Sequence, residues 1–579
     1  MSDEHDFRIR PGRIRSSRAQ RARPFIAQAL AAVQKAGGHV SRSGRISTTK
    51  RSHFGRGQRA SVQANRLLTG RSRVVVIKTR VVRHSARSAP LAAHLKYLGR
   101  EGVTRDGEKA RMFGPGDDAV YPKEFAERCQ DDRHHFRFIV SPADASDLAD
   151  LKSFSRDLMR QMEKDLGTKL DWVGVDHWNT DNPHIHIILR GKADDGQDLV
   201  ISRDYIKEGM RARAQDLVTL ELGPRTDLDI RQHLQRQVEA EHWTQLDRQL
   251  VRDGRRTGII DMAPDPNRMP DEYHALKVGR LRKLEALGLA DQVGPGQWVM
   301  GDGAEPTLRE LGERGDIIKR MHRALTGRGI ERGSASYVLA AESLDTPIIG
   351  RLVERGLDEE LKGSAYAVVD GVDGRTHHVR LPDIDAAGDS APGSIVELRK
   401  FEDARGQRFV ALAVRSDLDI ERQVNASGAT WLDRQNIARE PVALSEGGFG
   451  AEVRDALERR AEHLIEEGLA ERKGGRMLFA RNLIETLRRK ELGALGERLA
   501  AESGQPVNRA GSGEYVAGTY RQRFDLASGR FAMIDDGLGF QLVPWTPSLE
   551  KHCGSHVSGV TRSDGGMDWS FARKRGLGL

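Results

Sequence analysis

The stretch Asp176-His-Trp-Asn-Thr-Asp-Asn-Pro-His-Ile-His186 predicts how the N-terminal half of the chain folds. Its Asn/Asp/Pro centre is flanked by apolar, partly β-branched segments, which indicates two strands joined by a turn. His184 and His186 are two residues apart, so on a strand both imidazoles point to the same face. His177, at the end of the preceding strand, can fold back onto that face. The sequence therefore predicts three imidazoles around one point.

This set of side chains favours a metal site. Three neutral imidazoles that leave one coordination position open can bind a divalent ion, which polarises a substrate oxygen. By ligand preference alone, three imidazoles suit Zn²⁺ or another late transition metal. Asp176 and Asp181 are close in sequence and are candidates for orienting the imidazoles. The alternative interpretation is a set of solvent-facing or hydrogen-bonded histidines, since His-x-His spacing arises easily.

The segments around the hairpin predict an α+β fold built on an antiparallel sheet, filling about residues 71–225. Alternating or β-branched segments indicate strands, and apolar residues that recur on one face indicate helices. Expected strands are 73–82, 135–140, 170–175 and 184–189, and expected helices are 91–100, 147–166 (ended by Gly167) and 202–222.

The histidine stretch also resembles the third motif of conjugative relaxases in the HUH (His–hydrophobe–His) endonuclease superfamily. The likeness is greatest to the P-type mobilisation group, which includes the T-DNA border nickases. The family pattern is His-x-Asp-x-x-Asn-x-His-x-His, and its residues here are His177, Asn182, His184 and His186. The resemblance implies a relaxase (HUH nuclease) domain, expected over 71–255, in which the three histidines bind Mg²⁺ or Mn²⁺.

One position departs from the family pattern. Asn179 stands where the family has Asp, and an amide cannot take over the charged part of that residue's role. Asp181 or Asp176 is expected to substitute, and Asp181 is the candidate for the acid/base role.

The resemblance requires a nucleophilic tyrosine upstream of the histidines. Tyr97, in the segment His94-Leu-Lys-Tyr-Leu-Gly-Arg-Glu-Gly102, resembles the family's first motif. Lys96 and Arg100 flank it, and adjacent cations favour a phenolate and neutralise the attacked phosphate. A half-buried helix tyrosine is the alternative interpretation. Tyr205 is the rival nucleophile, but it follows the histidine motif, where the family does not place it.

Three further residues are candidate DNA contacts. Ser141, in Phe138-Ile-Val-Ser-Pro-Ala-Asp144, matches the family's second motif, a serine at a strand end that contacts DNA near the cleaved bond. A turn leading into a helix is the alternative, because Ser-Pro forms one unaided. Arg211 and Arg213 lie on the predicted helix after Tyr205 and are candidates for phosphate contacts, although helix arginines are often merely solvated.

The function implied by the resemblance is site- and strand-specific nicking of DNA at an origin of transfer. Metal-assisted tyrosine transesterification would form a 5′-phosphotyrosine intermediate for conjugative transfer of a plasmid or element. The implied partners are single-stranded DNA at the origin, accessory origin-binding proteins and a type IV coupling protein. Two alternatives stay open: a rolling-circle replication initiator of the same superfamily, and a non-catalytic winged-helix DNA-binding regulator.

Composition supports a nucleic-acid partner inside the cell. The chain has a net charge of +9 over 579 residues, and residues 1–70 carry 15 Lys/Arg against 3 Asp/Glu. Such a basic arm, which we expect to be disordered, can bind polyanions through phosphate contacts. Cys129 and Cys553, the two cysteines, are too far apart for a disulfide framework or a cysteine zinc site. No membrane insertion is expected, and a cytoplasmic location with export on bound DNA fits the resemblance.

The remainder of the chain is organised differently. Leu284–Ala290 and Leu464–Ala470 share a pattern in which a charged helix and a Gly-Leu step precede a short hairpin, as at the end of a winged helix. An ordinary helix C-cap that recurred by chance is the alternative. The expected divisions are a winged-helix-like unit at 256–335, a small β-rich unit at 336–425, a second winged-helix-like unit at 426–500, and a β-containing segment with a basic tail at 501–579.

This C-terminal half resembles a poorly characterised region that is found joined to such relaxases. The stretches that carry the likeness are Pro347–Leu357, Val369–Arg375 and Phe540–Trp545. This resemblance implies no known activity. A second group of possible metal ligands here fits no strong spacing template, and we expect turn residues at Asp370, Asp373, His377 and His378.

Overall fold

The computed structural model describes two short strands, β1 (His39–Val40) and β2 (Ile46–Ser47), and most of the chain after residue 70. The described ranges are 71–84, 91–99, 104–105, 110–178, 182–263, 273–340, 346–358, 361, 363–402, 406, 408–508, 511, 513–562 and 566–571. The rest of the expected basic arm and tail lies outside them, as do Arg100, Asn179, Asp181 and the side chains of Lys96 and Tyr97.

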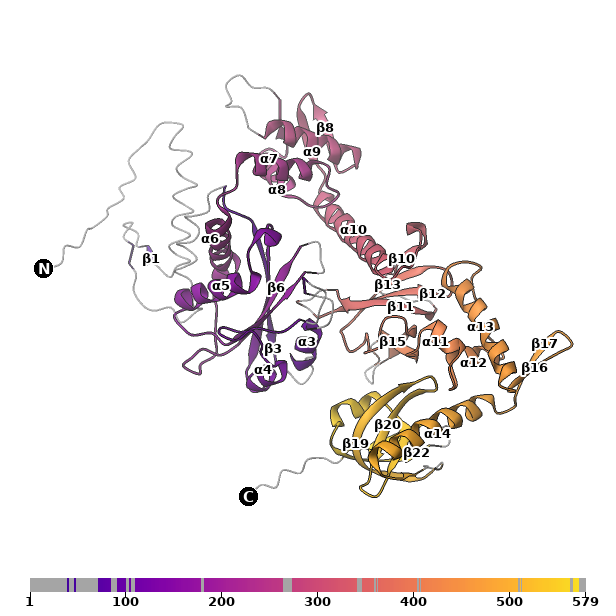
Figure 1. The fold of residues 1–579 in the computed structure, drawn as a ribbon. Coiled ribbons are helices and arrows are strands. Elements are labelled where there is room, and N and C mark those ends of the chain that lie inside the picture. The colour runs from indigo at the N-terminus through magenta and orange to yellow at the C-terminus, as the bar shows by residue number, and fades with distance from the viewer. Residues whose placement is uncertain are drawn as a thin grey trace, which may run out of the picture. The chain divides into compact units, whose positions relative to one another are not determined.

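The chain divides into two compact units, residues 1–309 and 310–579, and each is described by itself (Figure 1). The first unit holds a four-stranded sheet in which every neighbouring pair is antiparallel. Its spatial order is β3 (Val75–Arg83), β4 (His134–Pro142), β6 (His184–Arg190) and β5 (Trp172–His177). The expected α+β class with an antiparallel sheet is confirmed.

One face of this sheet packs against α5 (Leu151–Leu166) and α6 (Met210–Leu222) (Figure 1). Strand residues of one parity, such as Trp172 and Ile187, join the helices in a single apolar cluster. Helix α5 begins at Leu151, four residues later than expected, because Asp150 caps it and accepts hydrogen bonds from two backbone N–H groups. Gly167 ends it in the left-handed conformation, as predicted.

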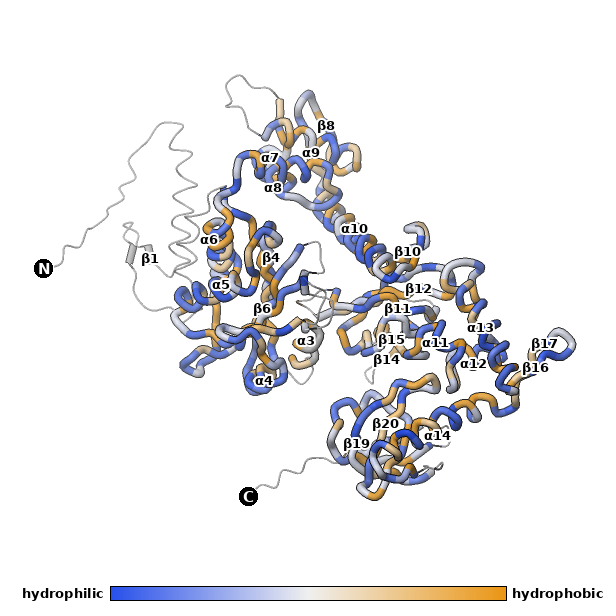
Figure 2. The backbone as a smooth tube through the Cα atoms, viewed as in Figure 1, coloured by the Kyte–Doolittle hydropathy of each residue, from blue (hydrophilic) through white to orange (hydrophobic). Residues whose placement is uncertain are grey.

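The opposite face of the sheet packs against α3 (Leu91–Leu98) and α4 (Pro122–Arg128). Val173, Val175 and Ile188, which have the other strand parity, form a second apolar cluster with these helices. The alternation of side chains along a strand thus separates two hydrophobic layers, and hydrophobic positions recur along β4 and β6 (Figure 2).

The first unit ends in a group of helices with a small sheet. Its elements are α7 (Asp227–Val238), α8 (Gln245–Gly254), β7 (Ile260–Asp261), α9 (His274–Ala286), β8 (Ala290–Gly294) and β9 (Gln297–Met300). Leu250 on α8 packs in one apolar cluster with Ile260, Leu281 and Trp298. The expected division at residue 255 therefore falls inside a hydrophobic cluster.

The division between the two units falls within α10 (Ala304–Thr326). A six-stranded sheet follows, with spatial order β10-β13-β12-β11-β14-β15 and a parallel pair at the β10 edge. Its strands are β10 (Tyr337–Ala340), β11 (Ile348–Leu357), β12 (Ala365–Gly371), β13 (Thr376–Leu381), β14 (Ile395–Glu402) and β15 (Arg408–Ser416).

Helices and a second sheet complete the second unit. The helical part comprises α11 (Ile420–Val424), α12 (Trp431–Asn436), α13 (Gly448–Glu466), the hairpin β16 (Ala470–Lys473) and β17 (Arg476–Phe479), and α14 (Leu483–Ser503). The sheet, in the order β18-β21-β20-β19-β22-β23, comprises β18 (Val507–Asn508), β19 (Tyr515–Leu526), β20 (Gly529–Asp535), β21 (Phe540–Pro544), β22 (His556–Thr561) and β23 (Met567–Ser570).

Both recurring sequence segments lie where a helix meets a hairpin, as the sequence predicted; their assignment as winged helices stays a prediction. The expectation of turn residues was wrong for Asp370, His377 and His378, which lie on β12 and β13, and holds only for Asp373. Asp370 forms ion pairs with Arg332 and Arg351. In the described part of the chain, no helix has both the length and the apolar character needed to cross a bilayer.

Candidate metal centre

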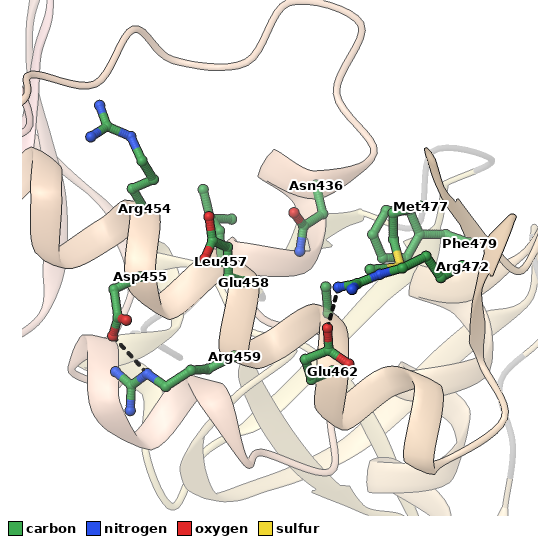
Figure 3. A pocket seen from close by; sticks show the side chains of 11 residues that line it. Asn436, Arg454, Asp455, Leu457, Glu458, Arg459, Glu462, Arg472, Met477 and Phe479 are labelled. Carbon is green, nitrogen blue, oxygen red and sulfur yellow. Dashed lines mark hydrogen bonds and ion pairs between the residues drawn. The ribbon is translucent and has the colours of Figure 1, made fainter. Parts of the chain in front are cut away.

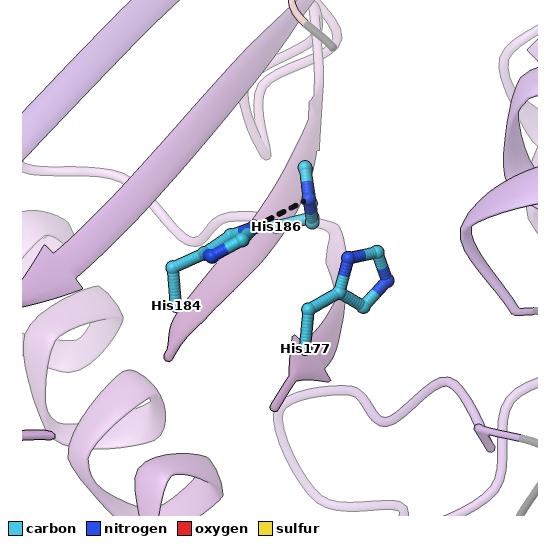
Figure 4. A group of neighbouring side chains, drawn as sticks. All are labelled: His177, His184 and His186. Atoms are coloured by element: carbon cyan, nitrogen blue, oxygen red, sulfur yellow. Dashed lines mark hydrogen bonds between the residues drawn. The ribbon is translucent and has the colours of Figure 1, made fainter. Parts of the chain in front are cut away.

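Three histidines meet at the turn end of the β5–β6 hairpin (Figure 4). His177 is the last residue of β5 and pairs directly with His184, the first residue of β6, while His186 lies two pairs further along, opposite Val175. All three share the strand parity of Val175 and Ile188, so they lie on the face of the sheet that α3 covers. Their exposed fractions are 0%, 8% and 3%, respectively.

The spacing of the ring nitrogens suits a metal ion. One nitrogen from each of His177, His184 and His186 lies within 4.8 Å of the others, and no other group of this kind occurs in the residues that the structure describes. His184 Nε2 and His186 Nε2 are 3.1 Å apart. With metal–nitrogen bonds of about 2.1 Å, two such ligands at a right or tetrahedral angle stand about 3.0–3.4 Å apart. The donor set therefore fits a divalent ion.

Hydrogen bonds to backbone carbonyls orient two of the rings. His184 Nδ1 lies 2.9 Å from the Asn182 carbonyl oxygen, and His177 Nε2 lies 2.9 Å from that of Leu98. Because a carbonyl only accepts, the ring nitrogen facing it carries the hydrogen, and the other nitrogen keeps its lone pair. These bonds select His184 Nε2 and His177 Nδ1 as the basic atoms, and Figure 4 shows both rings turned toward His186.

The bond from His177 also brings the helix with the candidate nucleophile to the centre. Leu98 and Leu95 are buried against the sheet and seat α3 there. Tyr97 is the residue before Leu98 on this helix, so the structure places its backbone beside the histidines. The side chain of Tyr97 is outside the described residues.

Ser141 also lies close to the histidine strand. It follows Val140, which pairs with Ile185 on β6, and its hydroxyl donates a 3.4 Å hydrogen bond to the Pro183 carbonyl oxygen. Asp176 has the opposite strand parity from His177, and its carboxylate accepts a 2.7 Å hydrogen bond from the Trp178 indole. It therefore points away from the imidazoles.

The candidates on α6 lie on the other side of the sheet. Arg211 is exposed, whereas Arg213 makes two 2.9 Å hydrogen bonds to the Asp165 carboxylate. Tyr205 donates a 2.9 Å hydrogen bond to the same carboxylate and is fully buried. Burial and the Asp165 charge raise the pKa of Tyr205, which disfavours a phenolate. The structure does not bring these residues to the histidine centre.

Sequence reasoning missed a second polar cluster on the sheet. Arg137 Nε donates a 3.0 Å hydrogen bond to His135 Nε2, and His84 Nε2 is 2.7 Å from His135 Nδ1. Burial, followed by the Arg137 and His84 charges, lowers the pKa of His135 to about 3. The spacing of His135 and Arg137, two residues apart on a predicted strand, was the signal that could have found it.

Comparison with known families gives one match. A family model described as "Protein of unknown function (DUF3363)" matches residues 277–405 and 398–578, together about half of the chain. The matched residues begin within α9 and do not include the histidine centre. Comparisons with curated proteins and with solved structures found no match.

Proposed function

The chain belongs to the DUF3363 family, whose description gives no function, and we propose that its N-terminal half is a metal-dependent DNA relaxase. The observation that carries this proposal is the convergence of His177, His184 and His186 beside helix α3, which bears Tyr97. A metal-binding imidazole trio next to a tyrosine helix is the arrangement that the resemblance to HUH nucleases requires.

The chemistry proposed is transesterification at a phosphodiester of single-stranded DNA. A divalent ion held by the three imidazoles, Mg²⁺ or Mn²⁺ by family resemblance and Zn²⁺ by ligand preference, would withdraw charge from the non-bridging oxygens of the scissile phosphate. The carbonyl bonds from Asn182 and Leu98 hold two of the imidazoles neutral and correctly turned.

Tyr97 supplies the nucleophile in this proposal. Its phenolic oxygen attacks phosphorus, the bond from phosphorus to the 3′ oxygen breaks, and the 3′ oxygen leaves as a hydroxyl after it takes up a proton. Asp181 is the candidate for transferring protons, and Lys96 and Arg100 for neutralising phosphate charge. Because one phosphodiester replaces another, the 5′-phosphotyrosine can be resealed without ATP.

The position of Ser141 agrees with a DNA path across this end of the sheet. Its hydroxyl lies beside the turn that enters β6, so a strand bound at the imidazoles would pass it. Arg213 is bound to Asp165 on the opposite face, and Arg211 lies on the same helix, so their proposed role is restricted to DNA outside the cleaved bond. The proposed partners are DNA at an origin of transfer, accessory origin-binding proteins and a type IV coupling protein.

A covalent-adduct assay tests this function. We would mix the full chain with Mn²⁺ and labelled single-stranded oligonucleotides that tile the DNA next to its gene, and separate the products on a denaturing gel. A protein-linked band should appear, vanish with chelator, and be absent in Tyr97→Phe. Tyr121→Phe is the matched control, because Tyr121 is 70% exposed and precedes α4.

Other outcomes of this assay would favour one of the two alternative functions. A band that survives Tyr97→Phe but not chelator would move the nucleophile to another residue, as in a rolling-circle initiator. DNA binding without an adduct on any oligonucleotide would favour a non-catalytic regulator that uses the helix–hairpin elements after residue 226.

A further inference from the structure

Two parts of the chain are built around the same buried arginine. We call residues 226–308 module A and residues 419–487 module B. Arg280 and Arg460, both fully buried, hold a carboxylate with Nε and Nη2, at 2.7 and 3.0 Å in module A and 2.8 and 2.9 Å in module B. Each also donates to three backbone carbonyls: those of Val238, Ala240 and His242 in module A, and those of Val424, Ala426 and Gly428 in module B.

The surrounding contacts repeat as well. In each module a threonine caps the helix that carries the buried aspartate, and a glutamine side chain accepts from the first two backbone N–H groups of that helix. The pairs that correspond are Thr244 and Thr430, Asp247 and Asp433, and Gln237 and Gln423. Modules A and B are therefore two copies of one structural unit.

The copies differ at the edge of their hairpins. In module A, strand β7 adds to β9 and forms a three-stranded sheet, and Ile260 and Met262 are buried beneath it. In module B, where residues 408–508 are described without a gap, β16 and β17 form a two-stranded sheet. Within the part of the chain that the structure describes, one edge of β17 has no strand beside it.

A groove of about 760 Å³ lies at this edge, between α12, α13 and β17 (Figure 3). The repeat aligns its lining with the residues that enclose β7 in module A. Position by position, Leu250, Val278, Leu281, Trp298 and Met300 of module A become Asn436, Glu458, Ala461, Met477 and Phe479 of module B. Around the space that β7 fills in module A, module B thus has three smaller side chains, Asn436, Ala461 and Met477, and two polar ones, Asn436 and Glu458.

Two polar groups in the groove suit an incoming peptide. The Nδ2 atom of Asn436 is buried without a hydrogen-bond partner. Glu458 lines the groove and forms no ion pair with any residue that the structure describes. In module A the carbonyl of Met262 accepts a 2.9 Å hydrogen bond from His274, and the corresponding residue in module B is Arg454, another donor.

We propose that module B binds an extended segment of a partner protein as a third strand along β17. Main-chain hydrogen bonds to an exposed strand edge provide affinity in such β-augmentation, and pockets for alternate side chains provide specificity. The segment carries a lysine or arginine at an inward-facing position, where it meets Glu458, and a backbone carbonyl that accepts from Asn436. A polar, under-filled groove suits an exchangeable strand, whereas the apolar groove of module A holds its own strand permanently.

Peptides based on β7 test this proposal on the full chain. The probes are a fluorescein-labelled peptide with the sequence of residues 255–264 and the same peptide with lysine in place of Ile260. Fluorescence anisotropy should show the lysine peptide binding up to about fivefold more tightly than the parent, the effect of one ion pair with the exposed Glu458 carboxylate. Glu458→Val, which restores the residue of module A, should reverse this preference.

The control variant is Glu466→Val, which removes an acid from the same helix outside the groove and should leave the preference unchanged. Met477→Asp should abolish binding of both peptides. The proposal is overturned if neither peptide binds at millimolar concentration, if a scrambled lysine peptide binds equally well, or if Glu458→Val leaves the preference unaltered. Displacement of the peptide by a duplex oligonucleotide would assign the groove to DNA instead. None of these outcomes depends on the histidine centre.

Discussion

The histidine centre and the buried arginines of modules A and B are both polar clusters in apolar surroundings, but they differ in charge balance. Arg460 is surrounded by acceptors: both oxygens of Asp433 and three carbonyls take its hydrogens. His177, His184 and His186 bring three bases together, with two Nε2 atoms 3.1 Å apart. The donors of the first cluster all meet acceptors, whereas the second brings one ring nitrogen from each of three imidazoles within 4.8 Å of the others.

This difference separates a structural role from a functional one. Fully satisfied buried polar groups hold a fold in one arrangement and present nothing to a ligand. Several imidazole nitrogens close to one point need a proton or a cation between them, and a divalent cation can take that place in a metal site. The comparison predicts that the arginines contribute to stability in every condition and that the histidines do so only with a ligand.

The largest effect should come from breaking a buried arginine pair. Arg460→Met leaves Asp433 and three carbonyls buried without their donor, which should destabilise module B by about 3–5 kcal/mol. Hydrogen-exchange mass spectrometry on α11–α13 would measure the loss. The neighbouring Arg459→Met, which breaks only exposed ion pairs, should cost less than about 1 kcal/mol. An equal loss of stability in Arg460→Met and Arg459→Met would show that Arg460 does not have the structural role assigned to it.

Metal binding should give the next largest effect. At a hundredfold excess over its Kd, an ion that binds the histidine centre should stabilise the native state by about 2.7 kcal/mol. His184→Ala removes one ligand and should abolish that gain, while the exposed His556→Ala should not. Isothermal titration with Mn²⁺ and with Zn²⁺, alongside thermal unfolding, would check this. Unchanged affinity in His184→Ala would exclude the centre as the binding site.

The cluster of His135 and Arg137 predicts that the free energy of unfolding falls as the pH is lowered. The pKa of His135 is about 3 when folded and about 6.5 when unfolded, so the unfolded chain takes up the proton first as pH falls. Its contribution to the free energy of unfolding is therefore complete above about pH 6.5 and should decline by about 2 kcal/mol between pH 7 and pH 5. Exchange rates in β3 and β4, measured at both pH values, should rise accordingly. His135→Gln should flatten this slope, and a slope that stays the same would contradict the assignment.

The smallest effect should come from the caps that hold the buried aspartates. Thr430→Ala removes the hydroxyl that donates to Asp433 and accepts from its backbone N–H, which should cost about 1 kcal/mol. Thr244→Ala should cost the same in module A, since the two caps have matching contacts. Local exchange in α8 and α12 would measure both. Clearly unequal costs would show that the modules differ in more than their hairpin edges.

Local patterns in the sequence predicted much of the fold around the candidate site. The hairpin, the strand at 135–140 and the stop at Gly167 follow from turn residues, alternation and a left-handed glycine, all of which act over a few residues. The division at residue 255 was less accurate, because the cluster of Leu250, Ile260 and Leu281 is assembled from segments that are distant in sequence. No local pattern marks such a boundary.

The sequence by itself determined that His184 and His186 share a face and that His177 can join them, because side chains alternate along any strand. Only the tertiary structure decided that this face is the one that α3 covers, and that Arg213 and Tyr205 lie behind the sheet on Asp165. It also decided that Arg280 and Arg460 are buried, since their partners are carbonyls and one aspartate tens of residues away. Which face a helix covers depends on how the chain crosses the sheet, and that is set by packing over the whole domain.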